Sequence, residues 1–328
     1  MTEAGEIHHV TASESGRLDR VLASAMDRSR SQVAKLIEAG AVAVEGSPVT
    51  RPSFKVEAGK EISYRILEAP KRESLPVEFE VEVLYEDEHL LVLNKPAGVV
   101  VHPAPSVREP TLVDWLISRG ISLSTLAGEE RHGIVHRLDK ETSGALVIAK
   151  TNAVHQALSE ELKSREMGRY YLALIDHPLR EDVTVEAPIA RNPANRLKMA
   201  VVEGGRNART DFLKLDRGRE GSELIAARLH TGRTHQIRVH LASLGRHILG
   251  DTLYGYRERK QGRIPRVFLH AALLYLTHPV RKERLEIAAP LPQDMQAYLH
   301  KHYTRSTIDE TNLPNRLPDE FARRFPGA

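Results

Sequence analysis

The chain has 328 residues, of which 41% are hydrophobic and 28% charged, with a formal charge of +3 at pH 7 and no cysteine. This length favours two folding units, and the composition is that of an ordinary globular protein. The lack of cysteine excludes disulfides, thiol nucleophiles and cysteine zinc sites, and it fits the cytoplasmic location that we expect. No segment resembles a signal peptide or approaches the length of a membrane span.

The first predicted unit is small. Residues 1–14 are polar and lack periodicity, so we expect a flexible N-terminus. Residues 15–66 contain two short segments with helical spacing, and the apolar side chains alternate as in strands at 42–44 and 62–66. We therefore predict a small α/β domain over residues 15–66. Basic residues on or beside its helices are candidate phosphate contacts, namely Arg17, Arg20, Arg28, Arg30 and Lys35.

A linker and a larger domain follow. Residues 67–77 contain prolines, mixed charge and no periodicity, which is typical of a linker. Residues 78–303 show many strand patterns with few interspersed helices, which predicts an α+β fold with a mixed, largely antiparallel sheet. Its clearest strand is the apolar run 145–149, and helical spacing returns at 235–244. The polar, proline-punctuated residues 304–328 predict an extended tail.

The polar segment HRLDKETSG, residues 136–144, comes directly before the apolar strand 145–149. Polar loops delivered by a rigid strand are common places for functional sites. Within this segment Asp139 is a carboxylate between two cations, Arg137 and Lys140. Spacing alone leaves open whether Asp139 is a functional acid or a salt-bridged turn residue.

The second dense segment is HTGRTHQIRVH at residues 230–240. Helical spacing places Arg238 at the edge of the buried face, where it either pairs with an anion or is a solvated helix cation. His235 and His240 are five residues apart, which is a poor spacing for metal ligands on one helical face, and no HExxH segment exists. Glycine-rich nucleotide motifs are also absent from the sequence. We therefore expect neither a metal nor a nucleotide cofactor.

Read together, the two segments are specific. HRLDKETSG and the downstream string GRTHQIR, residues 232–238, closely resemble the RluA-type pseudouridine synthases. Residues 16–66 resemble the small RNA-binding domain of the S-four type that commonly precedes this catalytic domain. The likeness covers about residues 15–300, and it departs from the family at Arg246-His247, where His-Pro is usual. Further stretches are most similar to the RluD branch of the family: Asn94-Lys95-Pro96, Arg169-Tyr170-Tyr171, residues 191–201 and residues 289–295.

The resemblance implies a pseudouridine synthase fold and an isomerase, without cofactor or metal, that acts on uridines of structured RNA, above all large-subunit ribosomal RNA. It makes Asp139 the catalytic carboxylate, which either attacks C1′ or takes the C2′ proton. Arg238 would keep Asp139 ionised, and Tyr171 would stack on the uracil. Arg137 would fill the space left by an extruded base. The other implied RNA contacts are His136, Arg233, His235 and Gln236.

Other interpretations of the sequence stay open. Between Arg191 and Arg257 there are 13 Lys and Arg against 6 Asp and Glu, which indicates a phosphate-binding stripe or a solvated basic face. A non-catalytic RNA-binding factor with the same fold is one alternative function. A glycosidase or nucleosidase with paired carboxylates is another, and it would release free base. A monomer is the default expectation.

Overall fold

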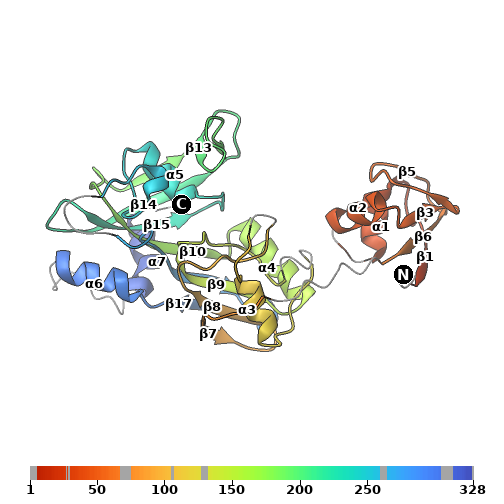
Figure 1. Cartoon of the computed structure of the whole chain (residues 1–328), viewed down its shortest axis with the longest axis horizontal. Coiled ribbons are helices and arrows are strands. Elements are labelled where there is room, and N and C mark those ends of the chain that lie inside the picture. Colours follow the sequence, from red (N-terminus) through yellow and green to blue (C-terminus); the bar gives the residue numbers. More distant parts are fainter. Residues whose placement is uncertain are drawn as a thin grey trace. The chain divides into compact units, whose positions relative to one another are not determined.

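The computed structural model separates the chain into two compact units, each described here by itself (Figure 1). The first unit lies within Met1–Ser74 and Thr125–His132, and the second within Leu75–Ser124 and Gly133–Ala328. The predicted linker, residues 67–77, lies mostly outside the described residues, so the predicted domain boundaries stay a prediction. The described residues are 6–26, 28, 30–66, 75–104, 107–126, 132–258, 264–303 and 313–326.

The first unit combines two helices with a four-stranded antiparallel sheet in the order β1-β6-β3-β4. Leu22 and Val33 from the helices and Ile62 from the sheet are fully buried in one core. The elements of this unit are β1 (Ile7–Thr11), β2 (Gly16–Arg17), α1 (Leu18–Met26), α2 (Arg30–Glu38), β3 (Val42–Val44), β4 (Ser47–Pro48), β5 (Lys55–Val56) and β6 (Glu61–Arg65).

The expectation of a flexible N-terminus over residues 1–14 is wrong for Ile7–Thr11. These residues form β1, which pairs with β6 along its whole length. Val10 packs against the small core, while the neighbouring side chains are at least partly exposed. The strand is held mainly by backbone hydrogen bonds to a sheet edge, and side-chain periodicity does not report such bonds.

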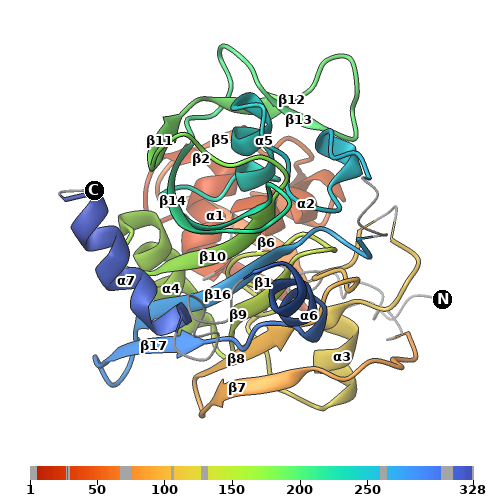
Figure 2. The ribbon, with the colours of Figure 1, turned by 90° about the vertical axis from the view of Figure 1, so that its left-hand side faces the viewer.

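The second unit is built on a nine-stranded sheet in the order β11-β14-β15-β10-β16-β9-β8-β7, with β17 paired to β16 (Figure 2). The described pairings are antiparallel except that of β9 with β16, so the predicted α+β class with a largely antiparallel sheet is confirmed. The strands are β7 (Glu82–Glu86), β8 (Leu90–Lys95), β9 (Ser143–Ala149), β10 (Gly168–Ile175), β11 (Val183–Glu186), β14 (Arg209–Arg217), β15 (Glu223–Leu229), β16 (Leu269–Thr277) and β17 (Arg284–Ala288).

Helices cover both faces of this sheet. Around β8 and β9, Trp115 of α3 packs with Leu91 and Leu146, whereas Leu158 of α4 packs with Val147, which points to the opposite face. Among the described helices none is long and apolar enough to cross a bilayer. The remaining elements are α3 (Leu112–Ser118), α4 (Asn152–Ser164), β12 (Ile189–Arg191), β13 (Met199–Val201), α5 (Gln236–Ser243), η2 (Thr252–Tyr254), α6 (Gln293–His302) and α7 (Leu313–Arg324).

The expectation of an extended tail over residues 304–328 is wrong for Leu313–Arg324, which form helix α7. Leu317 and Phe321 are one turn apart and fully buried, and the Phe321 ring lies 5.2 Å from that of Tyr170. The sequence did not predict this helix because it contains Pro314 and Pro318, and proline usually breaks a helix interior. Residues 304–312 of the expected tail lie outside the described residues.

Candidate active site

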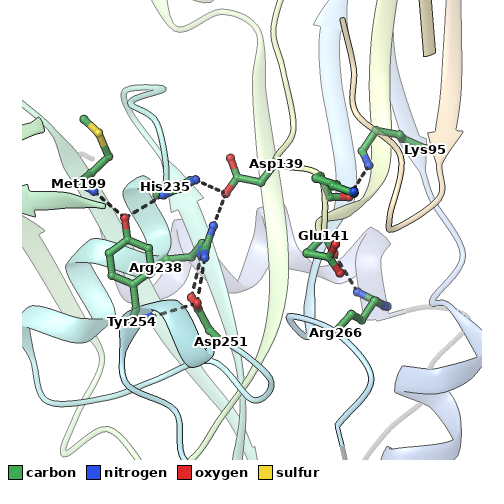
Figure 3. Close-up of polar contacts among 10 residues, drawn as sticks. Lys95, Asp139, Glu141, Met199, His235, Arg238, Asp251, Tyr254 and Arg266 are labelled. Atoms are coloured by element: carbon green, nitrogen blue, oxygen red, sulfur yellow. Dashed lines mark hydrogen bonds and ion pairs between the residues drawn. The ribbon is translucent and has the colours of Figure 1, made fainter. Parts of the chain in front are cut away.

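The loop that carries Asp139 precedes β9 at the point where β9 meets β16 (Figure 3). Gly144 makes this meeting possible. Its φ is +115°, and a Cβ at this position would overlap the carbonyl oxygen of Ala271 on β16. Leu138 is 4% exposed and anchors the loop in the core, while 18% of the Asp139 side chain stays exposed. The loop therefore presents a half-buried carboxylate from a fixed base.

Two buried cations hold the backbone next to Asp139. Lys95 Nζ donates to the Lys140 carbonyl at 3.1 Å, and Arg266 Nη1 donates to the Glu141 carbonyl at 3.5 Å (Figure 3). Lys95 is fully buried, and burial lowers its pKa to about 7. These bonds fix the path of the chain on the C-terminal side of Asp139.

Arg238 on α5 is the cation that contacts Asp139. Its Nη1 atom lies 3.1 Å from Asp139 Oδ2, and its Nε and Nη2 atoms bind the two oxygens of Asp251 at 2.7 and 2.9 Å (Figure 3). Burial lowers the pKa of Arg238, but the hydrogen bonds and charges of Asp251 and Asp139 outweigh burial and raise it above its ordinary value. Arg238 is therefore a permanent, oriented charge beside Asp139.

Two hydrogen bonds lead from Met199 to His235, whose ring faces the same carboxylate. The Met199 N–H donates to the Tyr254 hydroxyl at 2.8 Å, this hydroxyl lies 2.8 Å from His235 Nδ1, and His235 Nε2 lies 3.8 Å from Asp139 Oδ2. Burial is the main cause that lowers the pKa of His235, so its ring is neutral. The Tyr254 oxygen accepts the Met199 N–H, so we assign the Tyr254 O–H as the donor to His235 Nδ1. The proton of the neutral imidazole is then on Nε2, which faces Asp139.

Tyr171 and Arg137 occupy different environments. Tyr171 lies on β10 and is 4% exposed. Burial raises the pKa of its phenol, and the charge of Asp139 acts in the same direction. Among the described residues the Tyr171 hydroxyl has no hydrogen-bond partner. Arg137 is exposed, two residues before Asp139.

Some of the other predicted RNA contacts in this unit make hydrogen bonds within the protein. Gln236 donates from Nε2 to the Thr210 hydroxyl at 2.9 Å, and its Oε1 accepts the Arg233 N–H at 3.0 Å. Arg233 Nε in turn donates to the Asn207 carbonyl at 3.0 Å. His136 is 8% exposed. Gln236 therefore shapes the loop before α5, and its role toward RNA stays a prediction.

The predicted basic contacts of the first unit divide into two groups. Arg17 and Arg30 both bind Asp19, at 2.9 and 2.8 Å, and Arg20 pairs with a glutamate at 3.1 Å. These three guanidinium groups are about half exposed. The other two predicted contacts, Arg28 and Lys35, are exposed and have no ion pair with another described residue.

Two residues of the site were missed in the sequence. Asp251 neutralises Arg238, and Tyr254 connects His235 with β13. The three-residue spacing of Asp251 and Tyr254 is typical of a helix N-cap, and the Asp251 side chain does accept the Tyr254 N–H at the start of η2. That signal predicts a helix cap but not an ion pair 13 residues away along the chain.

The three histidines of the second segment do not gather. His230 binds Asp211 at 2.6 Å and His240 binds Thr210 at 2.9 Å, while His235 faces Tyr254. In the part of the chain that the structure describes, no group of His, Asp and Glu side chains is arranged to hold a metal ion.

Comparison with known proteins identifies the family. Residues 89–243 match the family model described as RNA pseudouridylate synthase, and residues 16–62 match the S4 domain. An uncharacterized RNA pseudouridine synthase of Helicobacter pylori is 46% identical over 303 residues, which cover 90% of this chain and 92% of that protein. The chain belongs to the RNA pseudouridylate synthase family. This pseudouridine synthase is therefore an isomerase with an RNA-binding S4 domain, as predicted.

Two further matches extend the comparison. Ribosomal large subunit pseudouridine synthase D of Zymomonas mobilis is 40% identical to this pseudouridine synthase over 291 residues, 85% of this chain and 92% of that protein. The structure of human RNA Pseudouridylate Synthase Domain Containing 1 is similar with a TM-score of 0.53 and 28% identity, covering 64% of this chain and 83% of that chain. The predicted family and its D branch are confirmed by these relatives.

Proposed function

We propose that this pseudouridine synthase isomerises uridines of large-subunit ribosomal RNA, and that Asp139 acts on the ribose of a uridine turned out of the RNA. The substrate proposal is supported by relatives named ribosomal large subunit pseudouridine synthase D, one of them 40% identical to this chain. The proposal for Asp139 is carried by one observation, the 3.1 Å contact of its carboxylate with Arg238.

Arg238 gives this contact a chemical purpose. A carboxylate in a water-poor pocket tends to take up a proton, whereas a guanidinium beside it favours the charged form. Only a charged Asp139 can attack C1′ as a nucleophile or remove the C2′ proton to give a glycal. Both routes begin from the same ionised state. Asp251 holds the other edge of Arg238, so the guanidinium cannot turn away from Asp139 without breaking two hydrogen bonds.

Isomerisation breaks the bond between C1′ and N1, turns the base, and joins C1′ to C5. A base stacked in a helix cannot follow this path, so the nucleotide has to leave the stack at a cost of roughly a few kcal/mol. Arg137 is suited to the vacated space, because it is exposed near Asp139 and a planar guanidinium stacks on bases. Tyr171 is suited to hold the uracil, because it lies close enough to Asp139 for the charge of that carboxylate to act on its phenol.

The first unit is proposed to hold the RNA by its charge. Its S4 match and its exposed cations Arg28 and Lys35 support this role. Contacts of this kind add affinity that falls with salt and carry little sequence information. We also propose that the first unit, in which β1 joins the predicted residues 15–66, acts as a domain of its own and is joined to the catalytic part by residues 67–77.

The test is a reaction of the purified chain with large-subunit ribosomal RNA transcribed without modifications. Mapping of pseudouridines should find a small set of modified positions, and those positions should be unmodified in cells that lack the gene. Chromatography of the same mixture separates the alternatives. Free uracil would identify a nucleosidase, and binding without any product would identify an RNA-binding factor. Modification of another RNA in preference to this one would contradict the substrate proposal.

A further inference from the structure

Strand β10 presents two side chains on the face that carries Tyr171. Residues on a strand alternate between faces, so Arg169 and Tyr171 share one face and Tyr170 points to the other. The contacts agree with this assignment, since the Tyr170 ring packs 5.2 Å from Phe321 on α7, while the charge of Arg169 is felt by the Tyr171 phenol. Arg169 therefore lies on the face that Tyr171 presents to the site.

Arg169 is a buried cation without a carboxylate. Three arginines of the described chain are less than a tenth exposed. Arg238 binds Asp139 and Asp251, and Arg266 binds Asp294 through two nitrogen atoms. The guanidinium of Arg169, by contrast, has no hydrogen bond or ion pair with any described residue, and its Nε atom is buried without a partner. Buried charges are costly unless they are paired, so this one is expected to have an anionic partner in the working enzyme.

His136, which lies near Arg169, offers a donor rather than an acceptor. His136 Nε2 accepts the Val147 N–H at 3.4 Å, so the proton of the neutral ring is on Nδ1, which is buried without a partner. Burial, and then the charge of Arg169, lower the pKa of His136 well below its usual value. On another side, Arg169 Nη2 lies 3.6 Å from the position that a Cβ of Gly232 would occupy. Arg169 thus lies beside residues of both sequence motifs, with its charge unmatched.

We propose that Arg169 is a catalytic residue that binds the uracil while the base is detached from the ribose and carries a negative charge. This inference rests on the proposed function. When the bond between C1′ and N1 breaks, its electron pair stays on the base and spreads over N1, O2 and O4. Asp139 either bonds to C1′ or takes the C2′ proton. That electron pair then forms the bond between C5 and C1′, which neutralises the base, while Asp139 leaves C1′ or returns the proton to C2′. C5 finally loses its proton and N1 takes one up, so the product has the same atoms as the substrate. Arg169 would hold the anion until C5 bonds to C1′.

Two facts favour the base over a backbone phosphate as this anion. Arg169 is 4% exposed, and it shares the strand face of Tyr171, the residue proposed to stack on the uracil. The phosphates of a bound RNA strand are solvated and are usually bound by exposed cations such as Arg28. A fixed donor aimed at charge that develops during a reaction lowers the barrier, and it adds little to binding of the neutral substrate.

The test compares Arg169→Met and Arg169→Lys with a matched control, Arg284→Met. Arg284 stacks on Tyr275 and is about half exposed, away from the motifs. In single-turnover reactions, Arg169→Met should lower the rate at saturating enzyme about a hundredfold, which is typical for loss of one donor to a developing anion. Arg169→Lys should keep part of that rate because it keeps a cation. Arg284→Met should react as the unaltered enzyme does.

Two readouts separate this role from binding and from folding. RNA affinity should be equal for Asp139→Asn and for the double variant Asp139→Asn/Arg169→Met, because the uracil is neutral before the reaction. The thermal midpoint of Arg169→Met should be equal to or higher than that of the unaltered enzyme, because the substitution removes an uncompensated buried charge.

A weaker RNA affinity with an unchanged rate would assign Arg169 to a phosphate, and a lower midpoint would assign it to the fold. Either result overturns the inference, as does an Arg169→Met enzyme that reacts normally. If the unaltered chain makes no pseudouridine, the proposed function fails as well, which distinguishes the two failures.

Discussion

The two units of this enzyme use their arginines differently. In the second unit, Arg238 and Arg266 are less than a tenth exposed and are tied to carboxylates through two nitrogen atoms each. In the first unit, Arg20 and its partner Glu14 are both more than half exposed. Breaking a buried pair leaves an uncompensated charge, while an exposed pair is exchanged for water or phosphate at little cost. Catalysis should therefore depend on the buried pairs and RNA affinity on the exposed cations.

The strongest test of that contrast is Asp251→Asn. It removes one of the two carboxylates that compensate Arg238, while Asp139 still compensates the charge. We therefore expect the free energy of unfolding to fall by about 3 kcal/mol through the loss of charged hydrogen bonding. Glu14→Gln is the control, since it breaks the exposed pair with Arg20 and should leave the unfolding midpoint unchanged. Urea unfolding of both variants decides the matter. Equal losses would show that burial does not separate the two kinds of pair.

Buried titratable groups should also set the acid stability of the second unit. His270 is fully buried, bonded to Ser143 and to a backbone carbonyl, and burial lowers its pKa from 6.5 to about 4. Between these pH values the unfolded chain binds a proton that the folded chain does not, so stability falls as the pH falls from 6.5 toward 4. The difference is about 3 kcal/mol at the lower end.

The measurement for His270 is the unfolding free energy as a function of pH. His270→Gln should flatten the curve between pH 4 and 6.5, the window set by the folded and unfolded pKa values. His9→Gln, on the exposed face of β1, should leave the slope of the unaltered enzyme. An unchanged slope in His270→Gln would place the acid sensitivity elsewhere.

Tyr254→Phe should have a smaller effect, confined to the reaction rate. It removes the hydroxyl between Met199 and His235 but keeps the ring over which Arg238 lies at 4.8 Å. We expect the rate at saturation to fall about tenfold, the usual weight of one neutral hydrogen bond, with the KM unchanged. Tyr64→Phe in the first unit is the control. A raised KM with a normal rate would mean that Tyr254 serves RNA binding instead.

The smallest effects are expected on the exposed side of the comparison. The double variant Arg28→Gln/Lys35→Gln should weaken RNA binding severalfold and reduce the salt dependence of the affinity by about two counterions. Its stability should not change.

The double variant Arg17→Gln/Arg30→Gln should instead destabilise the first unit. The hydrogen bond from Arg17, followed by that from Arg30, lowers the pKa of the buried Asp19 carboxyl to about 2. Binding titrations at several salt concentrations, with thermal unfolding alongside, measure both.

The sequence predicted elements whose periodicity reports their own burial. The apolar run 145–149 lies within β9, and the helical spacing at 235–244 contains α5. The sequence did not predict β1, which is held by backbone hydrogen bonds to a sheet edge. It also did not predict α7, whose prolines argue against a helix although two of its apolar side chains are buried. Local patterns cannot show either feature, because both depend on what a segment packs against.

The same limit applies to the site. The motifs indicated Asp139 and Arg238 as functional residues, and the structure brings them together across 99 positions of sequence. Their partners were not predictable, since Asp251 is a cap residue by its spacing, and the isolation of Arg169 is visible only when its surroundings are known. A sequence identifies charged residues, but which charges are compensated is decided by tertiary packing.

We propose that Asp139 performs the chemistry and is not needed to hold the RNA. The most direct measurement is single-turnover pseudouridine formation by Asp139→Asn, on an RNA to which the same preparation is shown to bind. We expect an RNA affinity equal to that of the unaltered enzyme and no detectable product. Product formed at the normal rate by Asp139→Asn would contradict it.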